Sequence, residues 1–108
     1  MSEGKVIAIY SDLFQKTWQK MVSIVGIHTV MVLVQRSLWQ TRQTYTEAEL
    51  IKVSEGGVSF EALKELDTQQ LKQMLEYFFT SLVDILARLV GEEVTQKIAD
   101  GINVFKNN

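Results

Sequence analysis

The sequence predicts an all-α domain, a bundle of four main helices over 5–25, 27–44, 68–90 and 92–106, with a short irregular or hairpin connector between the second and third. Apolar residues recur at steps of three and four along most of the chain, as the buried face of an amphipathic helix requires. Proline, which interrupts helices and central strands, is absent. The 108 residues, 46% hydrophobic and 22% charged, suit a single domain spanning 1–108.

The first predicted helix has a broad apolar arc. Its apolar residues at helical spacing are Val6, Ile7, Ile9, Tyr10, Leu13, Phe14, Trp18, Met21, Val22, Ile24 and Val25. These residues cover more than half of the helix circumference. Because an arc this wide on a terminal helix needs more partners than a small monomer offers, the sequence predicts self-association.

The second predicted helix begins with the run IHTVMVLV, whose β-branched residues could form a buried strand by propensity alone. Helical spacing continues beyond this run and favours a helix, whose main face carries Ile27, Val30, Met31, Val34, Leu38 and Tyr45. Gly26 either separates the first two helices or lies within one continuous helix, since a lone glycine costs only ~1 kcal/mol relative to alanine.

A second ridge runs along the same helix, away from its main face. It consists of His28, Val32, Gln35 and Trp39, at steps of four, three and four. One interpretation is that the ridge packs on another helix of the same chain. The other is that it forms a dimer or ligand surface, because a tryptophan beside a polar group is a common interface anchor.

The connector also has two interpretations. Thr46 and Glu49 match a capping box for a short helix, whereas ELIKV, SEGG and VSF match a hairpin with Gly56 and Gly57 in its turn. In both, Ser59 caps a following short helix. The glycine pair lacks the spacing and the Lys-Ser/Thr ending of a phosphate-binding loop.

The third helix is the clearest element, and the rest of the chain is organised around it. Asp67 and Gln70 form a capping-box pattern, and Gly91 supplies the left-handed residue that commonly ends a helix. Its wide apolar arc predicts contacts on two sides, and consists of Leu71, Leu75, Phe78, Phe79, Leu82, Ile85, Leu86 and Leu89.

The last predicted helix starts with Glu92 and Glu93, which place negative charge at a helix N-terminus. A narrower apolar stripe follows, made of Val94, Ile98, Ile102 and Phe105. Residues 89–98, LVGEEVTQKI, resemble helical segments attached to prokaryotic signalling proteins. This resemblance implies a signalling context and no role for any single residue.

Composition excludes several kinds of chemistry. The chain has no cysteine, so disulfides and thiolate chemistry are absent, and a reducing, cytoplasmic location is expected. A single histidine excludes a His-rich metal site, and no nucleophile-elbow motif or pair of converging carboxylates is present. We therefore expect no enzyme activity, metal or cofactor. No signal-peptide pattern begins the chain, and the apolar window 22–34 is shorter than the ~20 residues that span a bilayer.

His28, the only histidine, has three interpretations. It could be the single axial ligand of a haem held between the second and fourth helices, or a phosphoacceptor on a bundle. The simplest interpretation is a partly buried structural histidine. The first of these gives the alternative function of the chain, a small-molecule or haem-binding sensor with its site near His28.

Charge is distributed unevenly along the chain. Residues 1–45 carry five Lys/Arg and two acids, whereas residues 46–108 carry six Lys/Arg and eleven acids. Attraction between the two halves of one fold, or between two copies, explains this distribution. An excess of about three positive charges over 45 residues is thin for a nucleic-acid surface.

The sequence thus predicts a homodimeric, non-enzymatic helical interaction module in prokaryotic-type signalling or regulation, with another protein as the second candidate partner. The predicted interface lies on the first two helices. Its anchors and adjoining polar group are Trp18, Val32, Trp39 and Gln35, and its steering charges are Lys16, Lys20, Arg36 and Arg42.

Overall fold

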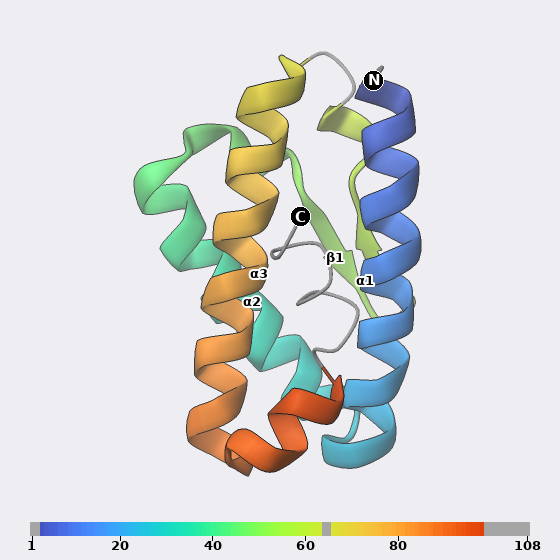
Figure 1. The fold of residues 1–108 in the computed structure, drawn as a ribbon, viewed down its shortest axis with the longest axis vertical. Coiled ribbons are helices and arrows are strands. Elements are labelled where there is room, and N and C mark those ends of the chain that lie inside the picture. Colours follow the sequence, from blue (N-terminus) through green and yellow to red (C-terminus); the bar gives the residue numbers. More distant parts are fainter. Residues whose placement is uncertain (1–2, 64–65, 99–108) are drawn as a thin grey trace.

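The computed structural model describes residues 3–63 and 66–98 (Figure 1). Its three long helices are α1 (Glu3–Val25), α2 (Ile27–Thr44) and α3 (Thr68–Val90). Between α2 and α3 lie the 3₁₀ helix η1 (Thr46–Leu50), the strands β1 (Lys52–Ser54) and β2 (Gly57–Ser59), and the 3₁₀ helix η2 (Glu61–Leu63). Residues 92–98 are also helical. The predicted all-α class is therefore confirmed.

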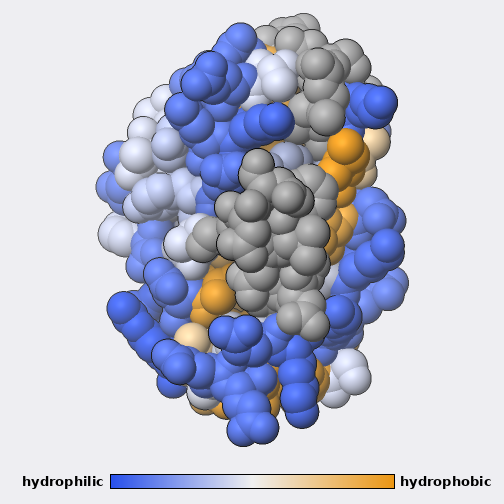
Figure 2. All heavy atoms as spheres, viewed as in Figure 1, coloured by the Kyte–Doolittle hydropathy of each residue, from blue (hydrophilic) through white to orange (hydrophobic). Residues whose placement is uncertain are grey.

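The long helices run lengthwise in alternating directions, α1 downward, α2 upward and α3 downward in Figure 1. The helical segment 92–98 crosses the lower end of the molecule from α3 toward α1. The hairpin of β1 and β2 packs on the helices, with β2 against α1 and β1 against α2. Hydrophilic residues cover most of the face seen in Figure 2, and hydrophobic residues show only in small areas between them.

Glycine forms two corners at the lower end of the molecule in Figure 1, one after α1 and one after α3. Gly26 has φ +87° and Gly91 has φ +89°, a left-handed conformation that side chains with a Cβ rarely adopt. The amide of Gly26 still donates to the carbonyl of Val22, at 3.0 Å, and that of Gly91 to Ala87, at 2.9 Å. Each preceding helix is thus completed before the chain changes direction, so Gly26 separates α1 from α2.

Replacing Gly26 with alanine is expected to lower the free energy of unfolding by about 1–3 kcal/mol, because φ +87° with ψ +157° is a region that only glycine adopts readily. A Cβ at this position meets no atom within 4 Å, so the loss comes from the positive φ alone. Gly56→Ala is the control, because its Cβ meets only Ser54 Oγ, at 3.8 Å, and its φ lies outside the left-handed region. Urea denaturation of both variants measures the difference. An equal loss in the two would contradict the corner geometry.

The connector combines its two predicted structures. Residues 46–50 form the short helix, and the strands form an antiparallel hairpin with Val53 opposite Val58 and Ser54 opposite Gly57. Its two-residue turn is therefore Glu55–Gly56, whereas Gly57, predicted to lie in the turn, is the first residue of β2. The amide of Glu61 donates to Ser59 Oγ at 3.5 Å, which agrees with the cap predicted at Ser59.

The core lies between α1, α2 and α3 and is closed by the connector. Phe14 is 1% exposed and is surrounded by the rings of Phe60, Phe78 and Phe79, with centroids 5.8, 5.3 and 5.2 Å away. The α3 N-terminus is capped as predicted, since Asp67 Oδ2 accepts from two backbone amides, at 3.2 and 3.3 Å. The apolar arc of α1 is thus largely buried against its own chain. The predicted helix beyond residue 98, with Ile102 and Phe105, lies outside the described residues.

The ionisation of Tyr10 makes the free energy of unfolding depend on pH in the alkaline range. Burial, followed by the nearby Glu76 carboxylate, raises the pKa of Tyr10 above its ordinary value of 10.0. Between the unfolded and folded pKa values the folded protein binds more protons, so the free energy of unfolding falls as pH rises past 10. Tyr10→Phe removes this dependence. From about pH 9 to about pH 11, wild type should lose stability relative to Tyr10→Phe; a constant difference would contradict the assignment.

Candidate functional site

The α2 ridge, formed by His28, Val32, Gln35 and Trp39, is exposed along its length. Val32 is 63% exposed and Trp39 is 62% exposed, the highest values among the large hydrophobic residues that the structure describes as exposed. The interpretation that this ridge packs on another helix of the same chain is therefore wrong. The interpretation as a contact surface stays a prediction.

The opposite face of α2 explains why the ridge turns outward. The buried residues of α2 are Val30, Leu33, Val34, Ser37, Leu38 and Thr41. Ser37 Oγ donates to the carbonyl of Phe78 in α3 at 2.9 Å, and Ser81 of α3 donates to Gln40 Oε1. Small polar residues at this contact let α2 and α3 approach closely and fix the rotation of α2 about its axis. That rotation directs Val32 and Trp39 to solvent.

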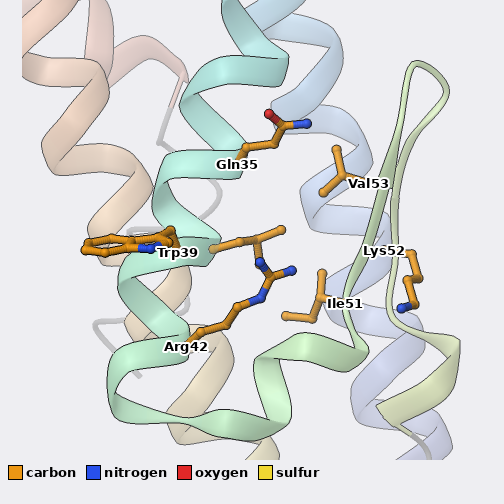
Figure 3. Close-up of a pocket in the computed structure, with 7 residues that line it drawn as sticks. Gln35, Trp39, Arg42, Ile51, Lys52 and Val53 are labelled. Carbon is orange, nitrogen blue, oxygen red and sulfur yellow. The ribbon is translucent and has the colours of Figure 1, made fainter.

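A groove of about 410 Å³ adjoins the ridge, between α2 and β1 (Figure 3). We call it the α2–β1 groove; its lining residues are Gln35, Leu38, Trp39, Arg42, Ile51, Lys52 and Val53. Leu38 and Ile51 are buried, at 2% and 1% exposure, and supply apolar surface. Gln35 and Val53 point toward each other across the groove, whereas Lys52 extends on the far side of β1 (Figure 3). The groove thus has both apolar and polar lining residues, and most of them belong to α2.

Arg42 reaches from α2 into this groove toward Ile51 (Figure 3). Its Nε is buried, and no hydrogen-bond acceptor within the described residues contacts it. A buried donor without an acceptor costs about 1–3 kcal/mol, and more in a charged group. No described carboxylate forms an ion pair with Arg42. The guanidinium therefore lies in the groove with its Nε–H unpaired in the free protein.

The charged residues of α2 and β1 are all basic. The sequence of α2 contains Arg36 and Arg42 and no acidic residue. Arg36 is exposed beside the ridge residue Gln35, and Lys52 follows at the start of β1. The arrangement can therefore attract a negatively charged group at the surface where Val32 and Trp39 supply apolar contact.

The other predicted interface residues lie elsewhere. Trp18 is 3% exposed and packs on Phe14 with a centroid distance of 6.4 Å, so it is a core residue and does not reach a partner. This corrects its prediction as an anchor. Lys16 and Lys20 are exposed on α1, beside Ser23 and Ile24, and neither lines the α2–β1 groove. Lys16 Nζ already lies 3.1 Å from Asp12 Oδ2.

His28 is exposed, so its interpretation as a partly buried structural histidine is wrong. His28 is the ridge residue closest to the N-terminus of α2, and it faces solvent as Val32, Gln35 and Trp39 do. A haem between helices requires a ligand that points into the bundle, and the orientation of His28 gives that site no support. Across residues 3–63 and 66–98, no group of three or more His, Cys, Asp or Glu side chains is arranged to hold a metal ion.

The wall of the groove opposite α2 was not predicted from the sequence; it consists of Ile51, which precedes β1, and of Lys52 and Val53 in β1. Helical spacing stops at Tyr45, and the connector pattern fitted two structures equally well. The alternation of Ile51, Lys52 and Val53 was the one available signal, because it gives a short strand two different faces.

Comparison with protein-family models, with curated protein sequences and with solved structures finds no match to this chain. Among the helices of the described segments, none combines the length and the apolarity needed to cross a membrane.

Proposed function

We propose that this protein is a non-enzymatic interaction module that binds a helix of a partner protein along the α2 ridge. The observation that carries the proposal is the exposure of Val32 and Trp39, at 63% and 62%, because these are the two most exposed large hydrophobic residues of the described segments and they lie on one ridge. Ridge positions at steps of four, three and four match the seam along which two helices pack. Trp39 is the expected anchor, since tryptophan is enriched among residues that carry binding energy.

The proposed partner helix is acidic. Arg36 and Arg42 on α2 have no acidic neighbour within that helix, so an acidic surface complements them. The proposed setting is cytoplasmic signalling or regulation, supported by the absence of cysteine and by the resemblance of LVGEEVTQKI.

A titration with synthetic helices tests this proposal. The first probe is a labelled three-heptad peptide with Leu at the a and d positions and Glu at e and g; the second carries Lys at e and g. Fluorescence anisotropy should show saturable binding of the Glu peptide and none of the Lys peptide at the same concentrations. Equal binding of both, or of neither, would contradict an acidic helical partner.

A second copy of this chain is the narrower version of the proposal. The midpoint of the ridge lies between Val32 and Gln35, so an antiparallel pairing places Trp39 beside His28 of the other copy and Val32 beside its Gln35. Such a dimer brings together two α2 helices that each carry Arg36 and Arg42 and no acidic residue. Like charges thus oppose this homodimer, and we favour the acidic partner.

Sedimentation equilibrium at low and high salt separates the two partners. Salt screens charge, so it should strengthen a dimer of basic ridges and weaken the complex with the Glu peptide. We expect a monomer at low salt. A dimer that is tight at low salt would make the second copy the partner.

A further inference from the structure

We propose that Arg42 is the residue in the α2–β1 groove that selects an acidic partner, by forming a bidentate pair with a carboxylate of the partner helix. This inference rests on the proposed function and adds the chemistry by which the partner is recognised. It follows from the placement of the guanidinium, its unpaired Nε–H and the polarity of the groove.

The guanidinium lies where a side chain of a helix on the ridge can reach it. Arg42 is three residues beyond Trp39 and continues the heptad spacing of the ridge into the groove. Figure 3 shows its side chain extending from α2 toward Ile51, in the space that Gln35 and Val53 border on the other side. Of the two charged residues that line the groove, Arg42 and Lys52, Arg42 is the one whose side chain lies between α2 and β1 in Figure 3.

The unpaired donor makes a pairing favourable. Arg42 Nε has no contact with solvent and no acceptor among the described residues, so the free protein leaves one N–H donor unsatisfied. A carboxylate has two oxygens in the fork geometry that matches the guanidinium. A rotation of the Arg42 side chain toward that carboxylate converts the unpaired Nε–H into one arm of a bidentate pair. Binding thus gives this donor an acceptor that no described residue supplies.

Neither of the neighbouring basic residues, Lys52 and Arg36, is placed to form this pair. Lys52 lines the groove, but its side chain extends on the far side of β1 in Figure 3. Arg36 lies on the outer surface of α2 and does not line the groove. We therefore assign steering of the partner to Arg36 and recognition of its carboxylate to Arg42.

Three variants test the inference with the Glu peptide as the probe. Arg42→Met keeps the apolar stem and should weaken binding at least tenfold. Arg42→Lys keeps the charge without the fork and should weaken binding severalfold. Lys72→Gln removes an exposed cation of α3, away from the groove, and should bind as wild type does.

The stability of the free protein gives a second readout. Because Arg42→Met removes an unsatisfied buried donor, its thermal midpoint should equal or exceed that of wild type, by up to about 4 °C. If Arg42 stabilised the fold, its replacement would lower the thermal midpoint. Binding of Arg42→Met within twofold of wild type, or a midpoint more than about 4 °C lower, overturns the inference.

These outcomes are separate from those of the proposed function. If wild type and Arg42→Met bind the Glu peptide equally well, the role of Arg42 is contradicted and the ridge remains the proposed interaction surface. If wild type binds neither peptide, both the proposed function and the role of Arg42 are contradicted. A single-stranded oligothymidylate is the third probe: if it binds more tightly than the Glu peptide and loses affinity in Arg42→Met, the group recognised is phosphate and the inference is overturned.

Discussion

Replacing Phe14 with alanine is expected to lower the free energy of unfolding by about 3–5 kcal/mol, the largest effect of any single substitution proposed for this chain. The ring is 1% exposed and stacks on Phe78 and Phe79 of α3, with centroids 5.3 and 5.2 Å away. It also meets the edge of Phe60 from the connector. Removing it opens a cavity where α1, α3 and the connector meet, and none of these elements can close it without losing other contacts.

Urea denaturation followed by far-ultraviolet circular dichroism measures this loss. Phe14→Leu is the control, since it keeps most of the volume and should cost distinctly less. A loss below about 1 kcal/mol for Phe14→Ala would mean that the aromatic cluster does not form the centre of the fold.

Replacing Trp39 with alanine is expected to weaken binding of the Glu peptide about thirtyfold, which corresponds to ~2 kcal/mol. The side chain is 62% exposed in the free protein, so a partner helix can bury most of its remaining surface. The same exposure means that the free energy of unfolding should change by no more than about 0.5 kcal/mol. Loss of affinity without loss of stability is the signature of a binding residue.

Leu89→Ala is the matched control for Trp39→Ala. Leu89 is also a large hydrophobic residue, 54% exposed, but it lies on α3 and lines no part of the α2–β1 groove. It should bind the Glu peptide as wild type does. If the two variants lose equal affinity, apolar surface in general is responsible, and the α2 ridge has no special role.

The helices could be predicted from the sequence because each has a complete local signal. Asp67 and Gly91 give both ends of α3, and the apolar spacing between them gives its buried face. α2 runs from Ile27 to Thr44 as predicted, despite its β-branched start, because packing of Val30 and Val34 outweighs propensity. At Gly26 the sequence left two conformations open, since the choice depends on how α1 and α2 pack.

The candidate site was only partly predictable, for a similar reason. Helical spacing grouped Val32, Gln35 and Trp39 on one ridge, which holds in the structure. It could not tell whether another helix covers that ridge, because this depends on tertiary packing. Trp18 shows the same limit, since its spacing fits a core face and an interface equally well, and the core contains it at 3% exposure.

The groove depended on contacts that no local pattern encodes. Arg42 and Ile51 are separated by η1, and they meet because η1 turns the chain back along α2. Charge could be read from the sequence, but the unpaired Nε of Arg42 appears only when its surroundings are known.

Nuclear magnetic resonance shows where on the protein the Glu peptide binds. Backbone amide shifts of the labelled protein are followed as the peptide is added. We expect the largest shifts in α2 from His28 to Arg42 and in the adjoining residues 51–53. Large shifts confined to α1 around Lys16 and Lys20, or to α3, with α2 unchanged, would contradict binding along the α2 ridge.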